Sequence, residues 1–205
     1  MRAPPMPVQV ALALAWYFVR MGHLGGAFLI VLGFDGFLRT GELLSLIIAD
    51  IKIGDEDTGV VRLEHTKTGQ RNAAFEATTI NDPLSIQLFR RYLQELPANT
   101  SHRNYVFLPK PYVFYDLFKK GLKWLGLDSY GFQPYSLRRG GATAYFRATR
   151  SMEATLDRGR WASARVARIY VNDGLAKEVE LRFTQETQER LRLYSAALQQ
   201  WLQRK

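Results

Sequence analysis

One tyrosine and two arginines of this chain are of the residue types that could cleave a phosphodiester without a metal ion. Such a reaction requires a nucleophile, cationic donors around the phosphoryl oxygens and an acid for the leaving hydroxyl. Tyr170 is the candidate nucleophile, although a phenol, whose reference pKa is about 10, needs cationic neighbours to react near neutral pH. Arg39 and Arg138 are the candidate phosphate clamps, because a guanidinium presents a rigid fork that matches two phosphate oxygens. Each of these residue types alone has an ordinary packing or surface role. Only their combination indicates a site that could cleave a phosphodiester.

The sequence around the two arginines favours anion binding. Arg39 follows a long apolar run, where a cation is costly unless it has a partner, and Glu42 supplies a carboxylate one helical turn later. A simple surface ion pair would also explain this spacing. Arg138 lies near the start of an expected helix, where backbone N–H groups favour an anion. Arg139 points elsewhere on that helix, and we expect it to contact the DNA backbone.

Two further side chains could support the reaction. Lys67 lies in a Thr-Lys-Thr-Gly turn between two expected strands, from which a flexible ammonium can donate a proton, although most such lysines are merely solvated. Trp161 could donate its indole N–H to a phosphate oxygen and pack against the helix of the nucleophile. Core packing alone would also account for this tryptophan.

The composition favours one basic domain. The chain has 205 residues, of which 47% are hydrophobic, so it can bury one good core. Its net charge of +9 favours an acidic partner, either nucleic acid or an anionic membrane surface, although a solvated basic surface is the simpler alternative. There is no cysteine, so the fold needs neither disulfides nor a thiolate metal site.

The apolar stretches of the chain do not indicate secretion or a membrane span. The run at 10–19 follows a basic residue like a signal peptide, but its only small-residue motif lies inside the apolar run. The run at 25–34 is far shorter than the roughly 20 residues that cross a bilayer. We therefore expect an intracellular protein that does not bind a membrane.

The periodicity predicts an α+β fold that is mainly helical and contains a small antiparallel β-sheet. Helices are expected at 8–22, 24–35, 39–46, 83–96, 112–125 and 134–149, a shorter element at 152–160, and a helical tail at 176–205. Short strands with turn signals are expected at 51–53, 60–64 and 73–75. Asp82 is the expected cap of the helix at 83–96, and Lys119 and Lys120 on the helix at 112–125 are expected DNA contacts.

In this order, the parts resemble the catalytic domain of tyrosine recombinases, the phage-integrase family, from roughly residue 8 to residue 180. Arg39 with Glu42 is similar to the first arginine box of the family, and Arg138 to its second arginine. Lys67 is similar to the lysine of the sheet hairpin, Trp161 stands where members carry His or Trp, and Tyr170 has the spacing of the nucleophile. The amino-acid sequence at 34–39 and 136–143 is most similar to that of recombinases from eukaryotic mobile elements of the DIRS and Crypton kinds.

The chain departs from the family pattern in two places. Tyr135 stands where the family usually has a His, and a phenol can donate a hydrogen bond to a phosphate but is a poor general base near neutral pH. The family also usually has a separate N-terminal domain that clamps DNA, whereas this chain begins at the catalytic domain. The resemblance therefore describes a single catalytic domain over 1–205, with a core at 8–180 and a tail at 176–205.

The resemblance implies a site-specific recombinase or integrase that acts on double-stranded DNA without metal, ATP or cofactor. Tyr170 would form a 3′-phosphotyrosine link, Arg39 and Arg138 would stabilise the transition state, and Lys67 would protonate the leaving oxygen. The tail would dock on a neighbouring protomer, or its basic residues would contact DNA. Two alternatives stay open: a type IB topoisomerase, and a degenerate, non-catalytic DNA-binding protein derived from a mobile element.

Overall fold

The computed structural model describes residues 3–55, 58–63 and 76–204. Their first half contains α1 (Val8–Arg20), α2 (Leu24–Asp35), α3 (Thr40–Ser45), η1 (Ile48–Asp50), β1 (Ile51–Ile53), β2 (Gly59–Leu63), β3 (Glu76–Ile80) and α5 (Pro83–Glu95). Their second half contains α6 (Pro111–Trp124), η2 (Asp128–Tyr130), α7 (Tyr135–Thr149), α8 (Met152–Gly159), α9 (Ala164–Tyr170), α10 (Asp173–Leu181) and α11 (Gln185–Gln203). The expected α+β fold, mainly helical with a small antiparallel sheet, is confirmed.

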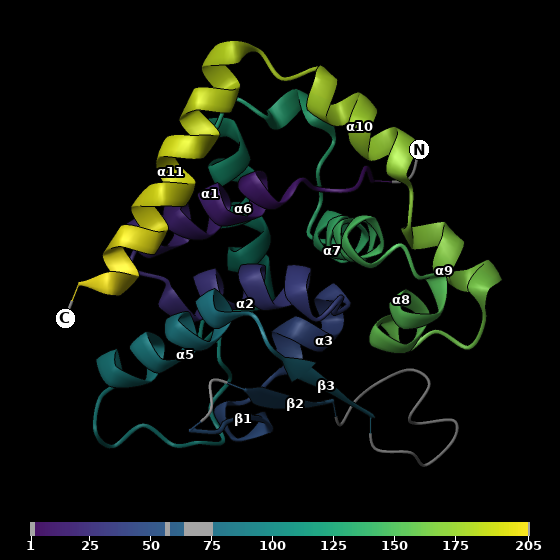
Figure 1. Cartoon of the computed structure of the whole chain (residues 1–205). Coiled ribbons are helices and arrows are strands. Elements are labelled where there is room, and N and C mark those ends of the chain that lie inside the picture. Colours follow the sequence, from purple (N-terminus) through teal and green to yellow (C-terminus); the bar gives the residue numbers. More distant parts are fainter. Residues whose placement is uncertain (1–2, 56–57, 64–75, 205) are drawn as a thin grey trace.

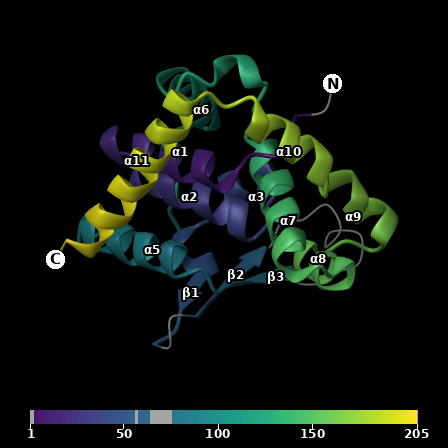
Figure 2. The ribbon, with the colours of Figure 1, turned by 45° about the horizontal axis from the view of Figure 1, so that its top comes forward.

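Helix α2 is the centre of the core. Its sequence is apolar almost all round, as a helix enclosed by others requires, and Phe28, Leu29, Ile30 and Leu32 are all fully buried. It packs against α1, α5 and α7, and Figures 1 and 2 show these helices around it. The helices expected at 8–22 and 24–35 are observed as α1 and α2, and both bury most of their apolar residues. The end of α2 at Asp35 thereby becomes a fixed point for the elements that follow.

The three strands form an antiparallel meander in the order β1-β2-β3, below α2 and α3 in Figure 1. Burial alternates along β2, with Val61 and Leu63 facing the core, as a sheet with one covered face requires. The strand expected at 73–75 lies outside the described residues. The observed β3 follows at once, and its polar residues had given no strand signal; Thr78 and Ile80 are its buried members.

The C-terminal tail forms two helices, of which α11 packs along α1 (Figure 1). Tyr194 stacks on Trp124 with ring centroids 4.2 Å apart, and the hydroxyl of Ser195 donates to the carbonyl of Gln9 at 3.2 Å. Leu191 and Leu198 are buried. The apolar side of α11 is therefore covered by its own chain in this structure.

Asp82 caps α5 as expected, since its carboxylate accepts from the backbone N–H of Ser85 at 2.8 Å. Among the described residues, no helix has both the length and the apolar character that crossing a bilayer requires.

Candidate active site

The site lies where α7 meets the end of α2. Two glycines of α7 allow this approach: a Cβ at Gly141 would lie 2.8 Å from the carbonyl carbon of Phe34 and 2.9 Å from the Phe37 ring. A Cβ at Gly140 would likewise lie 2.9 Å from the carbonyl carbon of Met6, so this glycine allows a close approach to the Met6 backbone. Arg138 stands one helical turn before Gly141, so the close packing carries its side chain to the loop that follows α2.

Arg138 is fully buried, with 0% of its surface exposed. One terminal nitrogen donates to the carbonyl of Phe37 and the other to the carbonyl of Gly159 at 3.2 Å, while its Nε has no hydrogen-bond partner among the described residues. Burial, and then the charge of Arg39, lowers the pKa of Arg138 to about 10. The interior thus holds a cation that water does not solvate and that keeps one donor for an incoming acceptor.

Glu42 joins three guanidinium groups. Its Oε1 lies 2.6 Å from Nη1 of Arg39, and its Oε2 accepts from the backbone N–H of Arg39 at 2.7 Å. The same Oε2 lies 3.3 Å from Arg160 and 3.8 Å from Arg138. The expected pairing of Arg39 with Glu42 is confirmed, and the 6% exposure of Glu42 shows that the pair is no simple surface bridge. Glu42 therefore holds both candidate phosphate clamps in one cluster.

Three aromatic rings stack beside this cluster. The rings of Phe37 and Trp161 are 6.1 Å apart, and those of Trp161 and Tyr170 are 4.6 Å apart, both at interplanar angles of 14°. The guanidinium of Arg138 lies 5.1 Å from the Trp161 ring and 4.8 Å from the Tyr170 ring. Trp161 is 4% exposed, and its indole N–H has no partner among the described residues. The ring of Tyr170, the candidate nucleophile, thus lies against Arg138 and beside the Trp161 indole N–H, which has no partner among the described residues.

Local bonds fix the backbone at Tyr170. Ser163 caps α9, and Tyr170 is the last residue of that helix. The hydroxyl of Thr143 on α7 donates to the carbonyl of Tyr170 at 3.4 Å and accepts from the N–H of Asn172 at 3.1 Å. These bonds attach the end of α9 to α7, the helix that carries Arg138.

Tyr135, which stands in place of the family's histidine, lies beside the nucleophile. The two rings are 5.8 Å apart. Burial, and then its hydrogen bond with Tyr170, raises the pKa of Tyr135 to about 12. Tyr135 therefore stays protonated at neutral pH and can act as a hydrogen-bond donor, not as a base.

Three of the sequence-predicted contacts lie apart from this cluster. Arg139 is 3% exposed and donates to the carbonyl of Ala3, because the N-terminal segment covers that side of α7; its contact with DNA stays a prediction. Lys119 and Lys120 are exposed on α6, which packs against α1, and Lys120 pairs with Asp116 at 2.8 Å. Lys67 lies outside the described residues.

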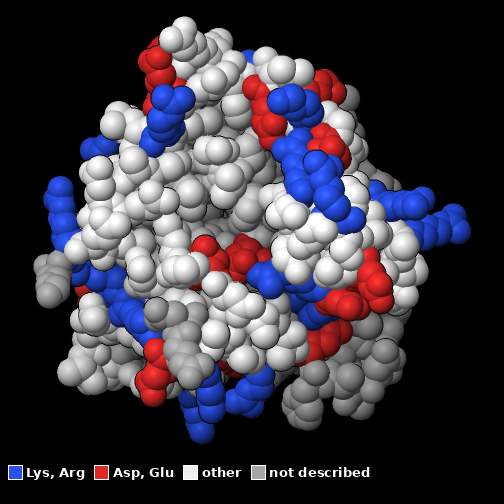
Figure 3. Space-filling view, viewed as in Figure 1, with Lys and Arg blue, Asp and Glu red and all other residues white. Residues whose placement is uncertain are grey.

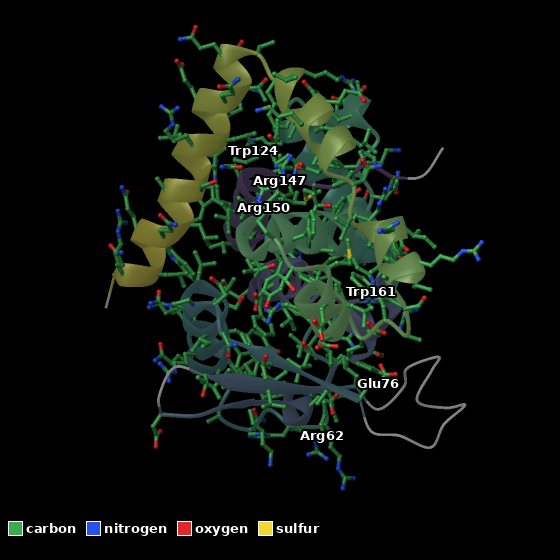
Figure 4. The ribbon with its side chains drawn as sticks, turned by 45° about the vertical axis from the view of Figure 1, so that its right-hand side comes forward. Arg62, Glu76, Trp124, Arg147, Arg150 and Trp161 are labelled. Atoms are coloured by element: carbon green, nitrogen blue, oxygen red, sulfur yellow. The ribbon has the colours of Figure 1, made fainter. Side chains whose placement is uncertain are left out.

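The sequence reasoning missed Arg160. Its side chain is 12% exposed, and its guanidinium reaches Glu42 and Glu76, which lie far away in the chain. Figure 4 shows Trp161, the next residue, on the same side of the molecule as Glu76 at the end of β3. A signal was present, since an arginine inside a Gly-Arg-Trp segment next to a candidate site residue has a guanidinium available for the same anion.

The charges around the site are mixed. On the face drawn in Figure 3, Lys and Arg side chains lie among Asp and Glu side chains over α10. Arg147 accounts for part of this pattern, since it pairs with Asp173 and, at 2.6 Å, with Glu180. Within the described part of the chain, no three His, Asp or Glu side chains gather that could hold a metal ion. The cluster can therefore bind an oxyanion through N–H donors, next to a phenol that can attack it.

Known structures share this fold. No protein-family model and no curated protein matches the sequence. The crystal structure of XerA recombinase matches with a TM-score of 0.67 at 16% identity, over 90% of this chain and 65% of that one. XerH site-specific recombinase bound to palindromic difH substrate, a post-cleavage complex, matches with a TM-score of 0.60 at 16% identity, over 82% of this chain and 50% of that one. The XerH pre-cleavage complex with difH substrate matches with a TM-score of 0.58 at 16% identity, over 92% of this chain and 54% of that one.

The chain has the fold of tyrosine recombinase catalytic domains. It spans between half and two thirds of the length of these solved recombinases.

Proposed function

We propose that this protein is a DNA strand transferase of the tyrosine recombinase kind, with Tyr170 as its nucleophile. One observation carries the proposal: the ring of Tyr170 lies 4.8 Å from the guanidinium of Arg138, inside a cluster whose guanidinium groups outnumber its carboxylates. A structural tyrosine needs no such surroundings, whereas a nucleophilic phenol needs cations that stabilise its charged form. The fold shared with XerA and XerH supports the same function.

The proposed reaction uses the residues in distinct roles. The Tyr170 oxygen attacks the scissile phosphorus, the bond from phosphorus to the 5′ oxygen breaks, and a 3′-phosphotyrosine link forms. The phenolic proton passes to water, and Lys67 protonates the leaving oxygen. Arg39 and Arg138 stabilise the charge of the transition state, and the indole N–H of Trp161 donates to a phosphoryl oxygen. A 5′-hydroxyl of another strand then attacks the link, so strands are exchanged without metal, ATP or cofactor.

The proposed partner is double-stranded DNA inside the cell. The net charge of +9 supports it, and XerH was solved with a difH substrate. We also propose self-association on DNA through α11. Since α11 packs along α1 of its own chain, exchange between protomers requires that it first leave this position. We propose an origin in a mobile element of the DIRS or Crypton kind on the amino-acid sequence of residues 34–39 and 136–143 alone.

Covalent capture tests the proposed function. The protein and its Tyr170→Phe variant are incubated with a nicked DNA library and denatured, and the DNA that stays attached is sequenced. We expect an adduct with the parent only, because phenylalanine keeps the ring and lacks the attacking oxygen. An adduct that survives in Tyr170→Phe would refute the assignment of the nucleophile.

A binding series separates catalysis from affinity. Both proteins should bind duplex DNA, with an affinity that falls steeply between low and moderate salt through counterion release. Binding without any adduct would favour a non-catalytic DNA-binding protein. An adduct that relaxes supercoiled DNA but never exchanges strands between paired sites would favour a topoisomerase. Binding that does not change with salt would contradict the DNA partner itself.

A further inference from the structure

Arg160 has a backbone conformation that glycine would adopt more easily. It follows the last residue of α8 with a φ of 55°, in the left-handed region. A non-glycine residue there is strained by roughly 1 kcal/mol, and such strain persists only where the surroundings impose it. The backbone alone does not require an arginine here, so the reason for it must lie in the side chain.

The Arg160 side chain joins three separate elements. Its Nη2 lies 3.3 Å from Oε2 of Glu42 on α3, its Nε lies 3.6 Å from Oε2 of Glu76 on β3, and its Nη1 donates to the carbonyl of Gly36 at 3.4 Å. The side chain is 12% exposed, so these contacts lie in a poorly solvated region where charge interactions are strong. A single guanidinium thus ties the end of α8 to α3, to the sheet and to the loop after α2.

The contact with Glu42 links Arg160 to both candidate clamps. Glu42 binds Arg39 at 2.6 Å and attracts Arg138 across 3.8 Å, while the carbonyls of Phe37 and Gly159 also hold Arg138. Among the described residues, three guanidinium groups face two carboxylates in this cluster, which leaves one net positive charge. Without Arg160, the charges of the remaining four groups would cancel.

We propose that Arg160 is a positioning residue that holds Glu42, and through it Arg39 and Arg138, in the arrangement that binds a phosphate group. The inference deepens the proposed function and rests on it for the identity of the phosphate as DNA. Arg160 acts on the bound phosphate only through its contact with Glu42. Its removal therefore displaces Arg39 and Arg138 and removes the net positive charge of the described cluster.

A matched pair of variants tests this inference. Arg160→Gly removes the side chain and suits the backbone angle. Arg150→Gly removes the same side chain at the same kind of backbone position, since Arg150 has a φ of 53°, directly follows α7 and is exposed. Arg160→Lys keeps the charge but lacks the fork that contacts two carboxylates. Urea unfolding first establishes that each variant is folded.

The first readout is independent of catalysis. Inorganic phosphate is titrated into the full chain while the Arg Nε–Hε resonances of Arg138 and Arg39 are followed by NMR. We expect Arg160→Gly to shift both resonances and to weaken phosphate binding by roughly tenfold or more, as is typical when a group that orients a ligand-binding residue is removed. Arg160→Lys should recover part of the affinity, and Arg150→Gly should match the parent. Equal spectra and affinities in the two glycine variants, or a parent that shows no phosphate response, would overturn the inference.

The second readout is the rate of adduct formation on captured DNA. If the parent forms no adduct but binds phosphate in an Arg160-dependent way, the proposed function fails and the positioning role stands. If the parent forms an adduct at a rate that Arg160→Gly leaves unchanged, the proposed function stands and the positioning role is refuted.

Discussion

The close packing of α7 on the end of α2 can be tested by adding one methyl group. In Gly141→Ala, the new Cβ would lie 2.8 Å from the carbonyl carbon of Phe34 and 2.9 Å from the Phe37 ring. The first neighbour is backbone and the second is a ring that is 1% exposed, so neither can move aside alone. The whole of α7 must shift, which should cost about 3 kcal/mol, the upper end of the range for overpacked cores.

A control glycine isolates this cost. Gly174 lies in the first turn of α10, is exposed, and a Cβ there would meet only the side-chain oxygen of Asn172 at 4.0 Å. Gly174→Ala should therefore show the helix preference alone, a gain of up to about 1 kcal/mol. Gly141→Ala has the same gain and the clash as well, so we expect a net loss of about 2 kcal/mol and a melting temperature lower by about 4–8 °C.

Urea unfolding of the two variants and the parent measures the difference. The shift of α7 should also separate Arg138 from the carbonyl of Phe37, so Gly141→Ala should lose phosphate binding even at temperatures where it is fully folded. A Gly141→Ala protein that unfolds at the same urea concentration as Gly174→Ala would refute the close approach of the two helices. The position of Arg138 that depends on this approach would then be wrong as well.

Two further substitutions test the burial of charge. Tyr170→Ala removes the ring that covers Arg138, whereas Tyr170→Phe keeps it, so inorganic phosphate should bind the alanine variant more tightly in a calorimetric titration; equal affinities would show that the ring does not restrict access. Burial raises the pKa of Asp35 above 3.8 despite its pairing with Arg158. Between the pKa of the unfolded state and that of the folded state, the folded protein therefore binds more protons, and its stability falls as pH rises. Asp35→Asn should remove that slope from a plot of unfolding free energy against pH, and an unchanged slope would contradict it.

The helical frame could be predicted because its signals are local. Segments 8–22 and 24–35 are apolar almost all round, which suits buried helices, and most residues of α1 and α2 are buried. Strand β3 could not be found this way, because Glu-Ala-Thr-Thr-Ile has one strongly apolar residue. Its pairing with β2 supplies the missing stability, and pairing between strands is not a property of either segment by itself.

The adjacent arginines of α7 show where helix periodicity stops being informative. Neighbouring positions differ by about 100° around a helix, so Arg138 and Arg139 had to face different surroundings. Arg138 lies in the candidate site, whereas Arg139 is buried elsewhere and its contact with DNA stays a prediction. The N-terminal segment lies over the second position, and Arg139 binds the carbonyl of Ala3. A contact between residues 136 positions apart leaves no trace in local sequence.

Arg160 was missed although its own segment carried a signal, because its partners Glu42 and Glu76 lie far away in the chain. Burial lowers the pKa values of both Arg138 and Arg160, which means that the folded protein holds these cations at a cost in stability. Glu42 and Glu76 offset only part of that cost, because three guanidinium groups face two carboxylates. A cluster selected for stability alone would be neutral or apolar. A bound anion would compensate this excess charge, which supports the proposed phosphate site.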